Sequence, residues 1–314
     1  MKAVVIHRYG SADVLQYEDV APPTIKADEL LVKVHASCIN PADWKIRKGM
    51  LKIVTGNKFP MILGFDLAGE VVEVGSNVTR FTIGDSIYGT LKPPNGGAYA
   101  EFVAVPENCT ALKPTNISYA EAASVPIAGL TALQGLRDQG NIKPGQAVLI
   151  NGASGGVGIF AVQIAKILGA EVSGVCSTKN LEFVKSLGAD RVIDYTQQDF
   201  TQDPVQYDII FDAVGKQSFF DCKKVLKPNG IYLTTLPTPE NILPGIVTMI
   251  IPGKKAKLVL ESPKAQDLIY LKELIEAGKL RIVIDRTYSL QELAAAHTYS
   301  ESEHAVGKIA IAVI

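Results

Sequence analysis

Residues 147–166 (AVLINGASGGVGIFAVQIAK) constrain this chain more than any other stretch. They open with an apolar run, residues 147–150, that has the length and branching of a buried strand. A turn with four glycines follows, and the rest shows an apolar face at helical spacing. Glycines let a backbone approach a pyrophosphate closely, and a helix N-terminus attracts the anion. The stretch predicts a dinucleotide-binding strand–turn–helix unit, although the glycines alone also fit an ordinary tight turn.

The segment after the next strand predicts which dinucleotide binds. Residues 171–175 read as that strand, and residues 176–180 (CSTKN) follow it. An NAD site usually carries Asp or Glu here, whereas two hydroxyls and an ammonium suit a 2′-phosphate. Two charged hydrogen bonds would favour NADPH over NADH by about a hundredfold or more. The residues expected around the phosphate are Ser177, Thr178, Lys179 and Asn180. Alternatively, Ser177 or Asn180 could simply cap the following helix.

The rest of the chain divides into two patterns. Roughly the first 115 residues show many short strand patterns separated by glycine turns, which indicates a small β-rich, barrel-like domain. After a helical section, strands and helices alternate as in a doubly wound parallel sheet. The last nine residues, 306–314, read as a strand that returns to the first domain. The predicted fold class is α/β, with domains at 1–117, completed by 286–314, and at 118–285.

Composition excludes several functional classes. The formal net charge of the 314 residues is −1, which gives no reason to expect nucleic acid as a partner. The longest apolar run, residues 242–251, contains Pro244 and Gly245, so no integral membrane segment is expected. The four cysteines are scattered without a CxxC pair, which excludes a cysteine zinc cluster and suits a reducing compartment. A cytoplasmic location is the expectation.

Several sequence blocks carry a family resemblance. They are NPADWKIRKG at 40–49, GFDLAGEV at 64–71, AGLTA at 128–132, GGVG at 155–158, GAD at 188–190 with Tyr195, and GKI at 307–309. Through them the chain resembles the medium-chain dehydrogenase/reductase superfamily over essentially its full length. It looks most like the zinc-independent quinone oxidoreductase (zeta-crystallin-like) branch, and within it the enone and alkenal oxidoreductases. The resemblance implies a GroES-like β-barrel catalytic domain and a Rossmann NADPH-binding domain.

The same family resemblance argues against a zinc alcohol dehydrogenase. Those enzymes take a cysteine ligand where this chain has Asn40, and a GHE motif where it has Gly64, Phe65 and Asp66. Phenylalanine cannot ligate zinc. Ionising an alcohol without a Lewis acid is hard, but quinones and α,β-unsaturated carbonyls take hydride directly because the negative charge ends on oxygen. No metal is therefore expected.

The resemblance also implies individual roles. Lys45 is expected to stabilise the developing charge and to touch the cofactor, and Asn40 to position a carbonyl or the nicotinamide ribose. Lys45 could instead be a solvated lysine, and Asn40 part of an Asn-Pro turn. Further cofactor contacts are expected at Thr131, Gly155, Gly156, Val157, Gly158, Tyr195, Gly215, Thr235, Leu236, Val306, Gly307 and Lys308.

The function that the sequence predicts is NADPH-dependent hydride transfer to the C=C bond of enones and alkenals or to quinones. The alternatives are a quinone reductase proper, with enones incidental, and a non-catalytic NADPH-binding sensor or structural protein. The substrate is expected to be small and hydrophobic. A homodimer, paired edge to edge through the strand around residues 257–260, is a family expectation.

Overall fold

A computed structural model describes residues 1–314, which fold into two compact units. Unit 1 comprises Met1–Ile127, Pro263–Gly278 and Ile282–Ile314. Unit 2 comprises Ala128–Ser262 and Lys279–Arg281. This division follows backbone contacts, and the functional domain ranges stated above stay a prediction.

Unit 1 is built on antiparallel strands, as the short strand patterns indicate. A three-stranded sheet has the order β2-β1-β4, and a larger sheet has the order β15-β16-β3-β5-β6-β8, with β7 pairing β3. The bounds are β1 Lys2–Ile6, β2 Gln16–Asp19, β3 Glu29–Ile39, β4 Met61–Ile62, β5 Asp66–Val74, β6 Ser86–Thr90, β7 Phe102–Pro106, β8 Thr110–Leu112, β15 Ile284–Ser289 and β16 Lys308–Ala312. Alternate residues of β3, including Leu30, Val32 and Val34, enter one apolar core.

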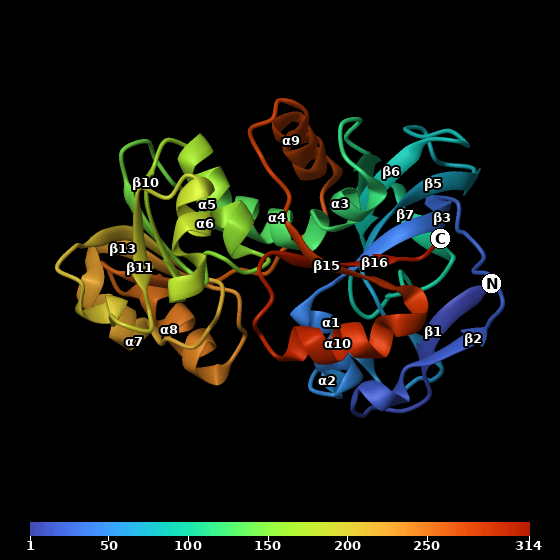
Figure 1. Cartoon of the computed structure of the whole chain (residues 1–314), viewed down its shortest axis with the longest axis horizontal. Helices are drawn as coiled ribbons and strands as arrows, with labels where there is room; N and C mark the ends of the chain where they lie inside the picture. Colours follow the sequence, from blue (N-terminus) through green and yellow to red (C-terminus); the bar gives the residue numbers. More distant parts are fainter. The chain divides into compact units, whose positions relative to one another are not determined.

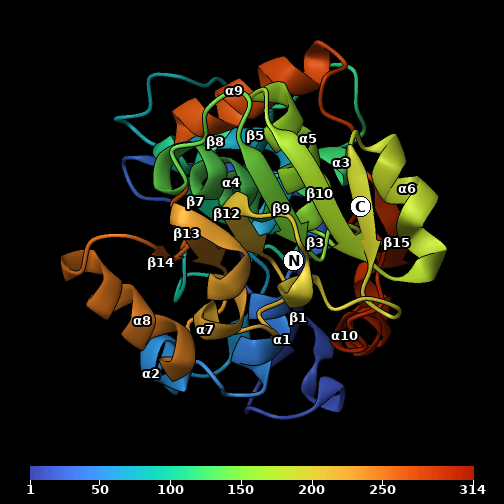
Figure 2. The ribbon, with the colours of Figure 1, turned by 90° about the vertical axis from the view of Figure 1, so that its left-hand side faces the viewer.

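Unit 2 contains a six-stranded, fully parallel sheet of order β11-β10-β9-β12-β13-β14. Figure 2 shows its central strands side by side. The bounds are β9 Ala147–Asn151, β10 Glu171–Cys176, β11 Arg191–Asp194, β12 Tyr207–Asp212, β13 Leu226–Thr234 and β14 Lys255–Leu258. The chain order reverses at β9 and β12, so this is the Rossmann arrangement that the sequence predicts.

Ten α-helices accompany the strands (Figure 1). Their bounds are α1 Pro41–Arg47, α2 Lys52–Thr55, α3 Tyr119–Ala123, α4 Pro126–Leu133, α5 Gly158–Ile167, α6 Leu181–Ser186, α7 Phe219–Cys222, α8 Pro239–Ile250, α9 Ala265–Glu276 and α10 Leu293–Glu301. The helical section predicted after residue 118 is interrupted at Pro126 and ends in a π-helical segment, Gln134–Gln139. None of these helices combines the length and the apolar character needed to cross a membrane.

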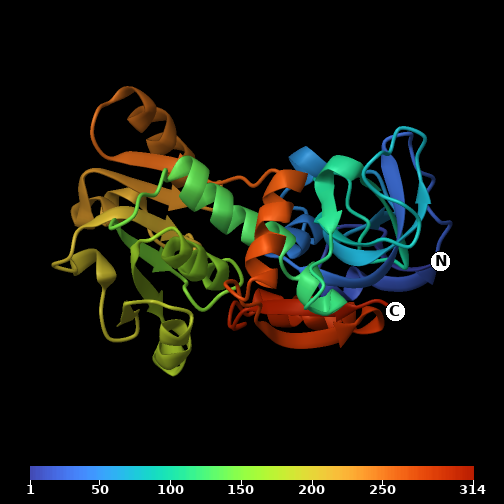
Figure 3. The same cartoon turned by 90° about the horizontal axis from the view of Figure 1, so that it is seen from above.

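The last strand joins the first part of the chain, as predicted. β16 pairs antiparallel with β3, with Ile309 opposite Ile39, and parallel with β15. The two final strands, drawn in red, lie side by side in Figures 1 and 3. On the other side of β3, Cys38 faces Asp66 of β5. This register brings the start of β16 and the start of β5 to the carboxyl end of β3.

The apolar run at residues 242–251 lies almost entirely within a helix, despite Pro244 and Gly245. Helix α8 spans Pro239–Ile250 and tolerates Pro244 in its second turn. Its buried side chains are Asn241, Pro244 and Thr248, and the amide of Asn241 donates to Leu236 O (3.1 Å). Because the apolar residues face outward and the polar ones inward, the sequence pattern does not resemble an ordinary amphipathic helix.

Candidate functional site

The turn between β9 and α5 has an anion-binding geometry. Gly152 has a φ of +79°, a conformation that favours glycine. A Cβ on Gly158 would meet the carbonyl oxygen of Gly152 at 2.0 Å, so the first helical turn packs directly on the loop. Gly158 is the first residue of α5, and the N–H groups of the first helical turn have no acceptor within the helix. Free N–H groups at a helix N-terminus fit a bound phosphate.

The segment expected around the 2′-phosphate lies beside this turn. It includes a short 3₁₀ helix, Thr178–Asn180, and the side-chain amide of Asn180 donates to Ser154 Oγ (3.1 Å). Lys179 is exposed, and its ammonium has no partner within hydrogen-bond distance. A second turn follows β11, where the N–H of exposed Tyr195 donates to Cys176 O (3.1 Å). Both turns therefore lie along the edge of the sheet that is formed by the carboxyl ends of its strands.

A carboxylate that sequence reasoning missed stands at this edge. β10 and β11 pair with Cys176 opposite Asp194. The Thr178 hydroxyl donates to Asp194 Oδ2 (2.6 Å), and the Thr196 N–H and hydroxyl donate to Asp194 Oδ1 (2.9 and 2.7 Å). Thr178 thus holds this turn together, and its expected contact with a phosphate stays a prediction. No carboxylate follows β10 in the sequence, and only strand pairing supplies one.

The carboxyl ends of β12 and β13 form the other half of this edge. Gly215 has a φ of +71°, and a Cβ there would lie 2.1 Å from Leu236 Cδ1, so the two residues pack together. Buried Asp212 accepts from the N–H of Gly215 (2.8 Å) and from the Asn151 amide (2.9 Å). The Thr235 N–H donates to Asp212 O (3.3 Å). The predicted contacts at Gly215, Thr235 and Leu236 therefore lie on the same edge as the glycine turn.

The donor set at this edge fits a phosphorylated dinucleotide. It offers the N-terminal N–H groups of α5 at the centre and the ammonium of exposed Lys179 to one side. Thr131 also belongs to unit 2, within α4, where it is 6% exposed. The remaining predicted residues, Asn40, Lys45, Val306, Gly307 and Lys308, belong to unit 1.

In unit 1, helix α1 begins at an Asn-Pro step. Asn40 is its N-cap, Pro41 takes the first helical position, and the Asp43 carboxylate accepts from the Asn40 N–H (2.7 Å). Lys45 is half-buried on this helix, with its ammonium 5.4 Å from the centre of the Trp44 ring. Burial lowers the pKa of Lys45 from its usual value. Desolvation strengthens the interaction of this cation with any negative charge that forms nearby.

Asn40 lies in a buried polar cluster with residues far away in sequence. The ammonium of Lys308 donates to Asn40 Oδ1 (2.7 Å), and Asn40 Nδ2 donates to Asp66 Oδ2 (2.9 Å). The other oxygen of Asp66 accepts from the Ile127 N–H (3.0 Å). Before Lys308, Gly307 has a φ of +86°, and a Cβ there would meet Val283 O at 2.4 Å. Lys308 therefore contacts Asn40 instead of pointing into solvent, and its expected role as a cofactor ligand stays a prediction.

The carboxyl group of Asp43, next to this cluster, is protonated more readily than an ordinary aspartate. Asp43 is fully buried, and one of its oxygens accepts from the Tyr99 hydroxyl (2.8 Å) while the other has no partner. Burial raises the pKa of Asp43 to about 7. Burial likewise raises the pKa of Asp66 to about 6, although Lys308 and Asn40 oppose this shift. The cluster therefore changes charge near neutral pH.

Replacing Asp43 with asparagine is expected to flatten the pH dependence of stability. The folded state binds the Asp43 proton more tightly than the unfolded chain does. The contribution of Asp43 to the free energy of unfolding is therefore complete below about pH 4 and is lost as the pH rises through about 7. Between pH 5 and pH 8, wild-type protein should lose about 2 kcal/mol more unfolding free energy than Asp43→Asn. Urea unfolding at the two pH values measures this difference. Asp19→Asn is the control, because an ion pair with Lys2 keeps the pKa of Asp19 low. Equal losses in wild type and Asp43→Asn would contradict the expectation.

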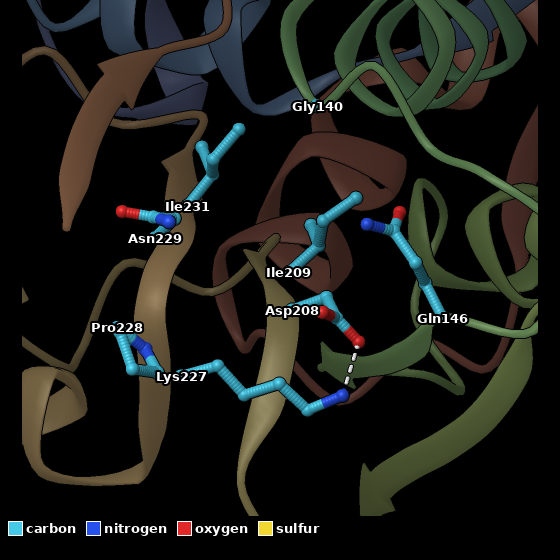
Figure 4. A pocket seen from close by; sticks show the side chains of 8 residues that line it. All are labelled: Gly140, Gln146, Asp208, Ile209, Lys227, Pro228, Asn229 and Ile231. Atoms are coloured by element: carbon cyan, nitrogen blue, oxygen red, sulfur yellow. Dashed lines mark hydrogen bonds and ion pairs between the residues drawn. The ribbon is translucent and has the colours of Figure 1, made fainter. Parts of the chain in front are cut away.

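No three His, Cys, Asp or Glu side chains are grouped so that they could hold a metal ion. One hollow of about 290 Å³ lies in unit 2, lined by residues such as Gln146, Asp208 and Lys227 (Figure 4). An ion pair between Lys227 and Asp208 (2.7 Å) spans it. Gln146 precedes β9, and Asp208 and Lys227 lie near the starts of β12 and β13. The hollow is therefore at the opposite edge of the sheet from the glycine turn.

Comparison with known proteins gives one consistent result. Residues 26–115 match the family described as the alcohol dehydrogenase GroES-like domain, and residues 187–311 match that described as zinc-binding dehydrogenase. A chloroplast envelope quinone oxidoreductase homolog of Arabidopsis thaliana is 38% identical over 322 residues, covering 99% of this chain and 98% of the relative. The NADPH-dependent alkenal/one oxidoreductase of the same plant is 38% identical, covering 99% of this chain and 79% of its own length. The solved quinone oxidoreductase from Coxiella burnetii superposes with a TM-score of 0.92 at 35% identity, covering 100% of this chain and 99% of that one.

Proposed function

Because this chain belongs to the quinone oxidoreductase branch of the medium-chain dehydrogenase/reductase superfamily, we propose that it reduces α,β-unsaturated carbonyls or quinones with NADPH. The observation that carries the proposal is the edge of the unit 2 sheet where the glycine turn and the Ser177–Asn180 segment meet. It offers free N–H groups for a pyrophosphate and an exposed ammonium, Lys179, for a 2′-phosphate. The names of the relatives support the reaction, and the donor set supports the cofactor.

The proposed reaction needs no metal. Where the resemblance puts zinc ligands, this chain has Asn40, Phe65 and Asp66, and Asn40 and Asp66 are hydrogen-bonded to each other. Phenylalanine is not a ligand, and the Asn40 oxygen is already bonded to an ammonium. An enone or quinone accepts hydride without prior ionisation, because the charge moves to its oxygen. These residues favour zinc-independent reduction over alcohol oxidation.

The chain's own residues would position the acceptor and stabilise charge. When bound, NADPH supplies the hydride. Lys45 would place a partly desolvated ammonium near the oxygen that becomes negative, and Asn40 would donate an N–H to an oxygen of the bound ligands. The free backbone N–H groups of the glycine turn would hold the pyrophosphate.

Turnover with a matched set of acceptors tests the proposal. NADPH oxidation by the purified protein is followed with an alkenal, an exocyclic-methylene ketone and a quinone, with NADH in parallel. We expect NADPH-dependent turnover, with alkenals or enones giving the higher kcat/KM. Turnover limited to the quinone would instead identify a quinone reductase proper, a function that the names of several relatives favour. Tight NADPH binding without oxidation by any acceptor would leave a sensor or structural role.

Alanine substitutions at two glycines are expected to separate folding from cofactor binding. At Gly155 a Cβ would meet nothing closer than Gly152 O at 3.4 Å, so Gly155→Ala should fold normally. The methyl group would still obstruct a pyrophosphate, and NADPH affinity should fall about tenfold. At Gly158 the Cβ would clash with backbone, and Gly158→Ala should lower the unfolding free energy by about 1–3 kcal/mol. NADPH titration and thermal denaturation of both variants measure this; unchanged NADPH affinity in Gly155→Ala would contradict the phosphate site.

We also propose that the protein forms a homodimer and is located in the cytoplasm. β14 lies at the edge of the parallel sheet, and exposed apolar residues of α8, including Leu243 and Met249, are adjacent to it in sequence. An edge strand of this kind can pair with its copy. Sedimentation equilibrium of the wild type over a range of concentrations tests the dimer. The location is tested by cell fractionation, since the plant relative carries a chloroplast envelope name.

A further inference from the structure

Three buried side chains at the carboxyl end of β3 form a chain of hydrogen bonds. Asn40 follows β3, Asp66 begins β5 and Lys308 begins β16, so the two partners of Asn40 come from the strands on either side. Lys308 Nζ donates to Asn40 Oδ1 (2.7 Å), and Asn40 Nδ2 donates to Asp66 Oδ2 (2.9 Å). All three side chains are less than 5% exposed, at 3% for Asn40, 0% for Asp66 and 4% for Lys308.

This arrangement leaves the Asn40 amide a single orientation. Turning it over would place its NH₂ group against the ammonium of Lys308 and its oxygen against the carboxylate of Asp66. Both contacts would be repulsive, and a buried unpaired charge costs several kcal/mol. The observed orientation instead makes two charge-assisted hydrogen bonds, each worth about 1.5–3 kcal/mol. One of the two N–H bonds of Asn40 Nδ2 remains free after the bond to Asp66.

We propose that Lys308 and Asp66 are positioning residues that hold Asn40 as a hydrogen-bond donor toward a carbonyl oxygen of the bound substrate. The inference rests on the function proposed above. Lys308 also polarises the amide, because a cation on the oxygen makes the N–H a stronger donor. Lys308 thereby places an ammonium group beside Asn40, in a family whose zinc members place a metal ligand at this position.

The surroundings support a positioning role over direct ligand binding. The charged and titratable groups that act on Lys308 from the neighbouring elements are Cys38 of β3, Asp43 of α1 and Asp66 of β5. Its ammonium already has an acceptor in the protein, and almost none of the side chain reaches solvent. A residue that binds the cofactor would change cofactor affinity when it is altered. A residue that orients Asn40 would change kcat and leave cofactor affinity unchanged.

The test uses two substitutions of Lys308 and one control. Lys308→Met and Lys308→Gln each shorten the side chain by one atom; the methionine removes the donor, whereas the glutamine keeps an N–H donor. Lys113→Met is the control, because Lys113 is also partly buried in unit 1 and donates to a backbone carbonyl, Pro114 O (2.8 Å). We expect kcat to fall about tenfold in Lys308→Met and to recover at least threefold of this loss in Lys308→Gln. The dissociation constant of NADPH should stay within about twofold in all three variants.

A second measurement does not depend on turnover. In protein labelled with ¹⁵N-asparagine, the side-chain signals of Asn40 are assigned by their loss in Asn40→Ala. We expect two widely separated, slowly exchanging proton signals in the wild type, and a narrower separation with faster exchange in Lys308→Met. If the wild type turns over no acceptor, the proposed function fails, and the NMR comparison still decides whether Lys308 fixes the amide. Unchanged Asn40 signals, or a raised NADPH dissociation constant with unchanged kcat in Lys308→Met, would overturn the inference.

Discussion

Replacing Lys45 with alanine is expected to lower kcat for enone reduction about a hundredfold, with little change in the free energy of unfolding. An ammonium about 4 Å from a developing oxyanion, at an effective dielectric constant near 20, contributes roughly 4 kcal/mol. Lys45 is only half-buried, so part of this energy is lost to solvent screening, and about 2.7 kcal/mol, or a hundredfold in rate, remains. Single-turnover kinetics with saturating NADPH isolate this effect from product release.

The chain supplies a matched control for this substitution. Lys48 lies against the same ring as Lys45, with its ammonium 5.1 Å from the centre of Trp44, and it pairs with Glu301 (2.5 Å). Lys48→Ala therefore removes an equivalent packing contact and an equal charge from the end of α1. We expect its kcat to remain within about threefold of wild type, as for a surface ion pair. Equal losses in the two variants would mean that the packing of Trp44, and not the Lys45 charge, matters for turnover.

Replacing Lys179 with alanine is expected to lower kcat/KM for NADPH by about tenfold to a hundredfold and to leave the value for NADH unchanged. One charge-assisted hydrogen bond to a phosphate is worth about 1.5–3 kcal/mol, which corresponds to this range. Lys179 carries most of the expected discrimination, because Thr178 donates its hydroxyl to Asp194 and Ser177 Oγ already interacts with Asn180 (3.3 Å). Steady-state kinetics with both cofactors measure the ratio.

Salt and a neighbouring lysine provide the controls for the Lys179 prediction. The difference between wild type and Lys179→Ala should shrink as ionic strength rises, since exposed charges are screened over about 10 Å at 0.1 M salt. Lys185→Ala, on α6, removes a lysine that pairs with Glu182 (2.8 Å) and should leave the cofactor preference unchanged. A similar loss for NADPH and NADH in Lys179→Ala would show that the residue does not contact the 2′-phosphate.

Much of the fold can be predicted from the sequence, because it depends on interactions between residues that are close together in the chain. The apolar run before the glycine turn, the glycines themselves and the helix that follows are contiguous, and each dictates its own geometry. The strands predicted at residues 147–150 and 171–175 are present as β9 and β10, each one residue longer than predicted. Helix α8 was missed because its buried side is formed by polar and proline residues, so hydrophobic periodicity could not reveal it.

In the candidate site, too, some features follow from the sequence and others only from the tertiary structure. Sequence alone identified the glycine turn, the Ser177–Asn180 segment and the Asn-Pro step, because each is a short motif whose geometry is set by its own residues. Only the tertiary structure decided what these motifs contact. Strand pairing brings Asp194 to Thr178 and places Lys308, 268 residues further along the chain, on Asn40. Such contacts depend on which strands pair and in which register, and the residues between them carry no local signal of that choice.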